Sequence, residues 1–555
     1  MARDAPVITL AELLGDDVDA PPAAGLGARV PGGVCLDSRL LEAGDLYLAV
    51  GGASTHGFRF AADALERGAV AVAVDPADVA RFDGALAETY RGLVASGAPL
   101  VEVADLARRA PFLAARFHAH PDRALTLVAV TGTDGKTSVC RFVATALEAL
   151  GTPCGYIGTI GWGRGDALAS TALTTPDAVT LPRMLAALRD GGARAVALEA
   201  SSHALAARRL DALALDVAVL TNLGRDHLDF HGDIASYRDA KARLFDFASL
   251  SAIVVNGDDP FGRDLAANDT SPLDATPDAA SGTAAPARVL YTVQAETREV
   301  DGRRDATDRV TGDTGGDGTV DVSGAVGAGA DVVRVHASDI RATADGLAFM
   351  LVDGDCRVRV ESPLMGRFNV ANLLACHGAL RALGHAPERA AAVLGTIRPP
   401  AGRMERFAAS GRPTVVVDYA HTPQALAAAI AAARAHCTGA LWVVFGCGGD
   451  RDPGKRAPMG RAAESADHVV VTDDNPRGEA SADIIAMVLD GMREPARATV
   501  VPGRRDAIAH AVRGAASDDV VLVAGKGHED YQIVGDTRLA LSDRVCVDEL
   551  LAEAC

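Results

Sequence analysis

The sequence predicts an α/β protein with three domains: a small N-terminal α/β domain, a central parallel-sheet domain with a phosphate loop, and a C-terminal Rossmann-like domain. The length of 555 residues suits two to four domains. A strand, a Gly-rich loop and a helix follow one another in "LTLVAVTGTDGKTSVCRFV". Further along, several Val-rich strands each end in a polar loop. Such runs are typical of parallel strands that are buried on both faces.

Residues 1–120 form the predicted N-terminal domain. The stretch "VCLDSRLLEAGDLYLAVGGASTHGFRFAADALERGAVAVAVD" alternates short apolar strands with a helical segment, as expected for a small α/β domain. The first residues, "MARDAPVITLAELLGDDVDA", lack a basic segment followed by an apolar core. This argues against a signal peptide, so we expect a cytoplasmic protein.

The overall composition excludes several classes of protein. The formal charge of −19 disfavours a nucleic acid as the main partner. No long uncharged apolar run is present, so we expect no membrane insertion. The nine cysteines form no CxxC pair, which suits a reducing compartment better than a disulfide framework or a zinc site.

The central domain is predicted over 121–397 and begins with the phosphate loop. Gly132 and Gly135 let the backbone turn and approach a phosphate closely, and the following helix offers free N–H groups. Lys136 can reach a phosphate, and the hydroxyl of Thr137 or Ser138 can bind Mg²⁺. The spacing G-x-x-G-K-[ST] is shorter than that of the standard P-loop, so a chance Gly-rich turn is the alternative.

Residues 297–330, "TREVDGRRDATDRVTGDTGGDGTVDVSGAVGAGA", are rich in Asp, Gly and Thr and poor in large apolar residues. We expect a mobile surface insertion in the central domain. An acidic calcium loop is the alternative interpretation, but the EF-hand spacing is absent.

The C-terminal domain is predicted over 398–555, after a linker marked by Pro399 and Pro400. Four strands each run into a polar loop in "TVVVDYAH", "ALWVVFGCGGDRD", "DHVVVTDDNPR" and "DVVLVAGKGHED". In parallel sheets the ligand crevice lies at the carboxyl ends of the strands, so we expect these loops to face one cleft. Cys447 in "GCGGDR" could suggest a nucleophile, but a packing role is the better interpretation.

Two loops of the central domain carry residues suited to metal chemistry. Glu199 ends the strand in "ARAVALEASSHAL", and "TNLGRDHLDFHG" supplies Asn222, Asp226, His227 and His231, with Lys241 on the helix that follows. Mg²⁺ prefers hard oxygen ligands, which fits Glu199 better than an imidazole. Taken singly, the Glu could be a helix cap and each His a hydrogen-bonded structural residue.

Eleven motifs together resemble the Mur ligases of peptidoglycan synthesis, in particular those that add the third peptide residue. They are "TGTDGKTS", "TTPD", "EASSHAL", "TNLGRDHLDFHG", "AKARLF", "GRFNVANLLA", "GRMERF", "DYAHTPQAL", "GCGGDRDPGKR", "DNPR" and "GKGHEDYQ". They occur in this order over roughly residues 35–260 and 335–545. The resemblance implies an ATP- and Mg²⁺-dependent amide ligase that acts on UDP-N-acetylmuramoyl-L-alanyl-D-glutamate through an acyl phosphate, with meso-diaminopimelate as the incoming amine.

The resemblance also assigns residues around ATP and the metal. It implies catalytic roles for Lys136, Glu199, His227 and Lys241, with Lys241 becoming carbamylated. The implied metal-binding residues are Thr137, Glu199, His227 and the carbamylated Lys241. The implied nucleotide-binding residues are Gly132, Thr133, Asp134, Gly135, Lys136, Thr137, Ser138, Asn369, Asn372, Arg403, Asp418 and His421. Asp134 departs from the Asn that is usual in the family, and its charge is unfavourable beside phosphates unless it points away or meets Mg²⁺.

The substrate contacts implied by the resemblance fall into two sets. The UDP-muramoyl dipeptide would meet Ser38 (with Asp37), Thr174, Thr175, Ser201 and Arg209, although Ala207 replaces a polar contact of some relatives. The incoming amino acid would meet Arg451, Asp474, Asn475, Pro476, Arg477, Gly525 and Glu529.

The prediction that the incoming amino acid is meso-diaminopimelate rests on Arg477. Its guanidinium can pair bidentately with the distal carboxylate of meso-diaminopimelate, and it would repel L-lysine. Glu529 can accept the distal ammonium. The alternative for Arg477 is a surface ion pair with Asp473 or Asp474. For the whole chain the alternatives are the same ligation with L-lysine, a folylpolyglutamate synthase-like ligase, and a nucleotide-switch binding protein.

Overall fold

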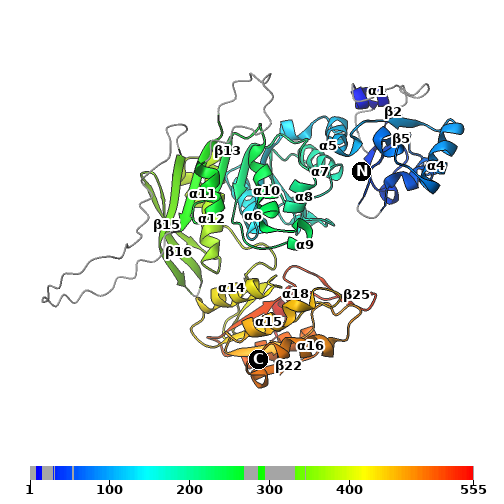
Figure 1. Ribbon diagram of the computed structural model, residues 1–555. Coiled ribbons are helices and arrows are strands. Elements are labelled where there is room, and N and C mark those ends of the chain that lie inside the picture. The colour runs from blue at the N-terminus through cyan, green and yellow to red at the C-terminus, as the bar shows by residue number, and fades with distance from the viewer. Residues whose placement is uncertain are drawn as a thin grey trace, which may run out of the picture. The chain divides into compact units, whose positions relative to one another are not determined.

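The computed structural model describes residues 8–15, 29–30, 32–52, 55–267, 285–293, 332–343 and 345–553 (Figure 1). The described chain forms two compact units, one up to Ile253 and one from Val254 onward. The interpretation of residues 297–330 as an insertion lies outside the described residues. The division after Ile253 falls within the predicted central domain, and the predicted boundaries near residues 120 and 397 stay predictions.

The first unit begins with a four-stranded parallel sheet in the order β3-β4-β5-β6. Strand β4 is buried along its whole length: Leu46 and Leu48 belong to one apolar cluster, Tyr47 and Ala49 to the other. Because β-strand side chains alternate between faces, the sheet is covered on both sides. The strands are β3 (Gly33–Cys35), β4 (Asp45–Ala49), β5 (Ala71–Val74) and β6 (Leu100–Glu102), and the helices are α1 (Leu10–Leu14), α2 (Ala61–Glu66), α3 (Pro76–Val79), α4 (Gly84–Ala95) and α5 (Leu106–Phe117), with a small pair β1 (Ile8–Thr9) and β2 (Arg29–Val30).

The same unit then builds a larger sheet in the order β10-β9-β8-β11-β7-β12. Strands β8, β11, β7 and β12 are parallel, so their carboxyl ends meet at one edge. The strands are β7 (Thr126–Thr131), β8 (Cys154–Gly158), β9 (Gly161–Arg164), β10 (Ala167–Ala169), β11 (Ala195–Glu199) and β12 (Val217–Leu220), and the helices are α6 (Lys136–Ala149), α7 (Thr180–Asp190), α8 (Ser202–Ala206), α9 (Leu228–His231) and α10 (Ile234–Ala242). Strand β13 (Ala252–Asn256) leads into the second unit.

The second unit starts with α11 (Pro260–Ala267) and a group of long strands. Strand β14 (Ala287–Val293) pairs in parallel with β15 (Val332–Thr343), which continues antiparallel into β16 (Gly346–Asp353) and β17 (Cys356–Ser362). Helix α12 (Phe368–Ala382) is buried along most of its length and packs on β14, and α13 (Pro387–Leu394) packs on β17.

The C-terminal part of this unit has a six-stranded sheet in the order β18-β19-β23-β20-β21-β22. Apolar residues of α14, α15 and α16 cover one face, and those of α17 and α18 cover the other. The Val-rich strands are thus buried on both faces, as predicted. The strands are β18 (Glu405–Phe407), β19 (Thr414–Asp418), β20 (Leu441–Phe445), β21 (His468–Val471), β22 (Ala498–Val500), β23 (Val520–Ala524) and the hairpin β24 (Tyr531–Val534) with β25 (Thr537–Ala540), and the helices are α14 (Pro423–Arg434), α15 (Arg456–Ala463), α16 (Ser481–Asp490), α17 (Arg504–Gly514) and α18 (Asp543–Ala552).

Both units therefore contain parallel sheets with helices on their faces, and the predicted α/β fold class is confirmed. In the part of the chain that the structure describes, no helix is long and apolar enough to cross a membrane.

Candidate active site

The phosphate loop joins β7 to α6, as the sequence predicts. Gly132 has a φ of 149°, and a Cβ there would collide with Thr221 Oγ1, so the strand can enter the loop only at a glycine. Gly135 is left-handed (φ 84°) and lies directly before α6. The free N–H groups of the first turn of α6 therefore open onto the loop, as an anion site requires.

The loop is held from its backbone by the segment after β12. Thr221 Oγ1 donates to the carbonyl of Asp134 (2.6 Å), and the amide of Asn222 accepts from Asp134 N (3.0 Å). The Asp134 side chain is exposed. Asp134 is thus anchored through its backbone, and its exposed carboxylate is not what holds the loop in place.

Lys136 folds back over the loop. Its ammonium donates to the carbonyls of Gly132 (2.9 Å) and Thr133 (2.9 Å). The positive charge therefore lies at the mouth of the loop, where a bound phosphate would exchange with these carbonyls.

Glu199 is the hub of a hydrogen-bond network at the end of β11. Its carboxylate is buried and accepts from Thr137 Oγ1 (3.0 Å), Tyr156 OH (2.6 Å), and both the backbone N (2.9 Å) and the hydroxyl (3.1 Å) of Thr159. A Cβ on Gly158 would collide with Glu199 and Tyr156, so the close approach of β8 needs a glycine. Four donors fix the carboxylate in one orientation beside the phosphate loop.

The donor set fits a magnesium ion. Thr137 and Glu199 offer adjacent hard oxygens. Among the described residues, no group of three His, Cys, Asp or Glu side chains is placed to hold a metal. Mg²⁺ is commonly held by one or two protein oxygens together with substrate phosphates, so a sparse set of protein ligands is what such a site needs.

His227 is not part of this network. It lies at the start of α9 with a left-handed backbone (φ 52°), its side chain is 46% exposed, and it pairs with Asp226 (3.3 Å). Its ring contacts that of His203, with ring centroids 4.7 Å apart. A metal role for His227 stays a prediction.

Lys241 is brought to the phosphate loop from 109 residues away in sequence. Its ammonium is buried on α10, donates to the carbonyl of Gly132 (2.7 Å), and lies 4.6 Å from the centroid of the Tyr237 ring. Burial, and next the charge of Lys136, lower the pKa of Lys241 to about 6. The amine is therefore largely uncharged at neutral pH, the form that can react with CO₂.

The residues expected to meet the dipeptide are linked to the Glu199 network. The Thr174 hydroxyl bonds to that of Thr159 (3.1 Å), and the Thr175 hydroxyl donates to the Glu199 carbonyl (2.7 Å). Ser201 N donates to the Thr175 hydroxyl (3.0 Å), and Arg209 donates to the Thr175 carbonyl (2.9 Å). The structure thus joins Thr174, Thr175, Ser201 and Arg209, while Thr175 is itself buried and braces the loop.

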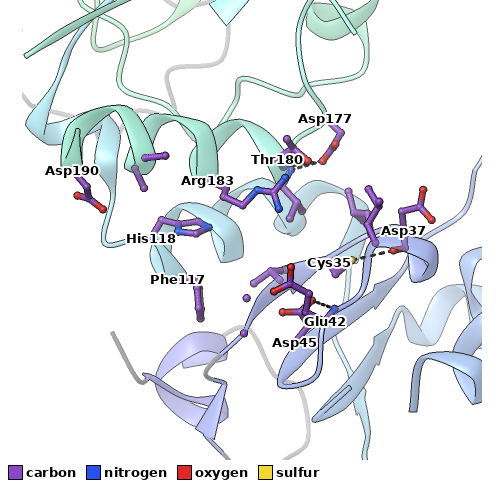
Figure 2. Close-up of a pocket in the computed structure, with 18 of the residues that line it drawn as sticks. Cys35, Asp37, Glu42, Asp45, Phe117, His118, Asp177, Thr180, Arg183 and Asp190 are labelled. Carbon is purple, nitrogen blue, oxygen red and sulfur yellow. Dashed lines mark hydrogen bonds between the residues drawn. The ribbon is translucent and has the colours of Figure 1, made fainter. Parts of the chain in front are cut away.

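A cavity of about 680 Å³ lies beside β3, α5 and α7 in the first unit (Figure 2). Asp37 lines it, but Ser38 is buried in the adjoining turn and does not. Figure 2 shows His118, Asp177 and Arg183 around the same cavity, three residues that the sequence did not single out. The "TTPD" motif contains Asp177 and was the only available signal for them.

The predicted nucleotide residues of the second unit lie in two places. Asn369 and Asn372 are buried on α12, where Asn369 donates to the carbonyl of Met365 (2.8 Å) and Asn372 donates to Asn369 (2.8 Å). Asp418 ends β19 and accepts from the backbone of Met404 and Ala420, and burial raises its pKa.

Arg403 and His421 both contact the Tyr419 ring. The Arg403 guanidinium is 4.7 Å from the Tyr419 ring centroid, and the His421 ring lies 4.7 Å from it. Burial lowers the pKa of His421, which favours the neutral imidazole. The structure therefore groups Arg403, Asp418 and His421 at the carboxyl end of β19.

The loops after β20, β21 and β23 bring the predicted amino-acid residues together. Arg477 has a left-handed backbone (φ 52°) that is bonded to β24 through Ile533 O (3.0 Å), and its guanidinium donates to Gly449 O (2.8 Å). Asp473 and Asp474 instead accept from backbone N–H groups, and no carboxylate of the described residues pairs with Arg477. The alternative of a surface ion pair with these aspartates therefore finds no support.

Asn475 and Glu529 are in direct contact, with Asn475 Nδ2 donating to Glu529 Oε2 (3.1 Å). Lys526, which the sequence reasoning missed, donates to the same oxygen (2.7 Å); the Lys–Glu spacing of three in "GKGHED" was its signal. A Cβ on Gly525 would lie 2.8 Å from Asp474 Oδ2. The backbone of Pro476 abuts Gly449, and Arg451 is exposed close to Gly448.

Cys447 lies in this region but is buried against Met459 (3.6 Å). Burial raises the pKa of its thiol to about 12, so the thiolate is not formed at neutral pH. Both observations agree with a packing role.

Three segments of the chain match known protein-family models. Residues 32–118 match the Mur ligase family catalytic domain, residues 130–293 match the Mur ligase middle domain, and residues 402–527 match the Mur ligase glutamate ligase domain. These three matches follow the order of the predicted domains.

Curated relatives match over nearly their whole length. A UDP-N-acetylmuramoyl-L-alanyl-D-glutamate--2,6-diaminopimelate ligase of Xanthomonas campestris pv. campestris is 43% identical over 94% of this chain and 93% of its own. The protein of the same name from Pseudomonas aeruginosa is 43% identical over 93% and 94%.

Solved structures of similar proteins include a ligase of the same name. A structure of a UDP-N-acetylmuramoyl-L-alanyl-D-glutamate--2,6-diaminopimelate ligase has a TM-score of 0.64 at 31% identity and covers 98% of this chain and 99% of its own. A folylpolyglutamate synthase of Mycobacterium tuberculosis shares the fold, with a TM-score of 0.51, 17% identity, and coverage of 80% and 96%. With the three domain matches and the identity over almost the full length, the chain belongs to the Mur ligase family.

Proposed function

We propose that this protein is a cytoplasmic, ATP-dependent ligase that joins meso-diaminopimelate to UDP-N-acetylmuramoyl-L-alanyl-D-glutamate. The observation that carries the proposal is the 43% identity, over 94% of the chain, to a ligase named for these two substrates. Two positions support it: Lys241 lies against the phosphate loop, and Arg477 has no carboxylate partner among the described residues.

In the first half of the reaction, the free D-glutamate carboxylate attacks the γ-phosphorus of ATP. A bond forms between the carboxylate oxygen and phosphorus, and ADP leaves. Lys136 and the first N–H groups of α6 hold the phosphates, since phosphoryl transfer needs mainly positioning and neutralisation of charge. Thr137 and Glu199 would hold Mg²⁺, which supplies further neutralisation of phosphate charge when it is bound.

Lys241 would act as an anion and not as a cation. The neutral Lys241 amine can add to CO₂ with loss of a proton, which turns a buried amine into a carbamate anion with two hard oxygens. His227 is proposed to support the second metal position.

In the second half, the amine of the incoming amino acid attacks the acyl carbon, the bond to phosphate oxygen breaks, and phosphate leaves as the nitrogen loses a proton. Arg477 would bind the distal carboxylate of meso-diaminopimelate and Glu529 its distal ammonium. Asn475 and Pro476 hold the Arg477 loop, and Arg451, Asp474 and Gly525 complete the pocket.

The remaining alternatives are ligation with L-lysine and a folylpolyglutamate synthase-like reaction. L-Lysine would leave Arg477 without a carboxylate partner. The likeness to folylpolyglutamate synthase is one of fold, at 17% identity.

Phosphate release tests the proposal when it is measured with ATP, Mg²⁺, the UDP-dipeptide and, in turn, meso-diaminopimelate, L-lysine or glutamate. We expect rapid release and formation of the UDP-tripeptide with meso-diaminopimelate alone. Preference for another amino acid, or ATP hydrolysis that consumes no amino acid, would contradict the proposal.

A further inference from the structure

Lys526 is one of few lysines in a chain whose basic residues are almost all arginines. Of the 54 lysine and arginine residues, only four are lysines: Lys136, Lys241, Lys455 and Lys526. Where a bare charge suffices, this sequence uses arginine. A lysine in this chain therefore points to a place that needs an amine side chain and not a guanidinium, as we propose for Lys136 and Lys241.

Two hydrogen bonds and one aromatic ring surround the Lys526 ammonium. The ammonium is fully buried, donates to Glu529 Oε2 (2.7 Å) and to Asn475 Oδ1 (3.2 Å), and lies 5.3 Å from the centroid of the Tyr531 ring. Tyr531 begins β24, so the ammonium connects the loop of Asn475 to the segment that runs from Glu529 into β24.

The same contacts determine how Asn475 is oriented. Its Oδ1 accepts from Lys526 and from Ile533 N (2.9 Å), which leaves Nδ2 to donate to Glu529. Both Asn475 and Lys526 thus converge on one oxygen of Glu529. Among the described residues, the other oxygen, Oε1, has no bonding partner, and the Glu529 side chain is 17% exposed.

Building on the proposed function, we propose that Lys526 is the positioning residue of the diamino-acid pocket. Its compact ammonium locks Oε2 of Glu529 and the amide of Asn475, so that Oε1 faces the distal ammonium of the substrate. Arg477 is tied to the same framework, because its backbone N bonds to Ile533 O and its guanidinium lies 3.4 Å from Asn475 O. Lys526 touches no substrate and acts through Glu529.

A double-mutant cycle of Lys526→Met and Glu529→Gln tests this, read as KM and kcat for meso-diaminopimelate. K526M should raise this KM roughly 10- to 100-fold with kcat within a few-fold, because lost uniform binding appears in KM. KM values for ATP and the UDP-dipeptide should not change. In the E529Q background, K526M should add less than about 3-fold, since interacting residues are not additive.

A matched control is Arg381→Met, which breaks a partly buried ion pair with Asp353 (2.7 Å) far along the chain from the pocket loops. It should lower thermal stability and leave the KM for meso-diaminopimelate unchanged. Lys526→Arg keeps the charge but cannot keep the compact geometry in a site with no exposed surface, so we expect the same rise in KM as for K526M.

Several results would overturn the proposal. Equal KM increases by K526M in the wild-type and E529Q backgrounds would show that Lys526 does not act through Glu529. A K526R variant with wild-type KM would show that any cation suffices. If K526M alone does not fold, the double variant, which removes both buried charges, is compared with E529Q, and a 10-fold difference between them would be decisive against positioning. A wild-type enzyme inactive with meso-diaminopimelate would instead defeat the proposed function itself.

Discussion

Lys241 and Arg477 show how a single side chain takes its chemistry from its surroundings. Both are basic residues in loops or helices that look unremarkable in isolation. Lys241 is enclosed against Gly132 and Tyr237, and its pKa is lowered to about 6 by burial. Arg477 instead keeps its guanidinium next to carbonyl groups, without a carboxylate partner among the described residues. Lys241 is thus placed to lose its charge, and Arg477 is placed to bind an anion with its charge.

We expect Lys241→Ala to nearly abolish ligation, because the site would lose its carbamate anion. High bicarbonate should not help this variant, but short carboxylic acids such as formate or acetate should partly restore turnover by occupying the space of the missing carbamate. The measurement is phosphate release with all three substrates. An unmodified lysine in a high-resolution map of the wild-type protein, or no rescue by any acid, would count against carbamylation.

Arg477→Ala should lower kcat/KM for meso-diaminopimelate by roughly 10- to 150-fold, since a lost hydrogen bond to a charged partner costs about 1.5–3 kcal/mol. Binding of ATP and the UDP-dipeptide should barely change. Arg538→Ala is a suitable control, because Arg538 is an exposed guanidinium that lies over the Tyr531 ring. Full activity of the Arg477 variant would show that the "DNPR" loop does not bind the distal carboxylate.

At the scale of elements, function gathers where parallel strands end. Strand β7 ends in the phosphate loop, β11 ends in Glu199, and β21 and β23 end in the loops of Arg477 and Glu529. Parallel pairing alone places such ends at a common edge, which is why the strand-and-loop pattern was enough to predict shared sites. The pairing of two strands also determines how much of the chain between them can be deleted.

The predicted insertion at 297–330 connects β14 to β15, which pair in parallel with Arg288 opposite Val332 and Val293 opposite Ala337. The connection must therefore return along the strand by about five residues, roughly 17 Å. A direct join after deletion leaves only residues 294–296 and 331, which reach at most about 18 Å and leave nothing for the turns. We expect this direct join to unfold or inactivate the enzyme.

Replacing 297–330 with about eight Gly and Ser residues should keep kcat within a few-fold, because loop length changes closure entropy by only about 0.6 kcal/mol per doubling. Activity and the thermal midpoint of both deletions give the comparison. A large loss of activity with unchanged thermal stability in the linked variant would show that the insertion itself has a function.

At the scale of the whole molecule, buried imidazoles make stability depend on pH. His528 lies against Tyr419, with ring centroids 5.1 Å apart, and burial together with the charge of Arg403 lowers its pKa to about 4. Its Nδ1 is buried and has no hydrogen-bond partner among the described residues. The folded protein thus holds His528 neutral in a range where the unfolded chain protonates it.

Because the folded-state pKa lies below the ordinary value of 6.5, the stabilisation is complete above about pH 6.5 and declines as the pH falls toward 4. His528→Gln should flatten this decline by on the order of 1–3 kcal/mol in the free energy of unfolding. Urea unfolding at pH 7.5 and 4.5 measures the free energy of unfolding of the wild type and of the variant. Subtracting the change with pH in the variant from that in the wild type removes the contribution of the carboxylates, which both proteins share. An equal loss of stability in both proteins would contradict the assignment.

The sequence by itself determined the fold class, the phosphate loop and the family. These rest on local order: a Val-rich strand, a Gly-rich loop and a helix predict their own geometry, and the motifs of a family keep their order along the chain. The same reasoning found Glu199, Lys241 and Arg477, because each lies in a motif. It left Ser38 assigned to a cavity that Asp37 lines instead.

Only the tertiary structure decided the state of these groups and their partners. The low pKa of Lys241 depends on burial beside Lys136, and the orientation of Glu199 depends on Tyr156 in β8 and on Thr159 just after that strand. Lys526 was missed because its role comes from contacts with Asn475, distant by 51 residues. Desolvation and hydrogen bonding between segments are properties of packing, and spacing along a chain does not contain them.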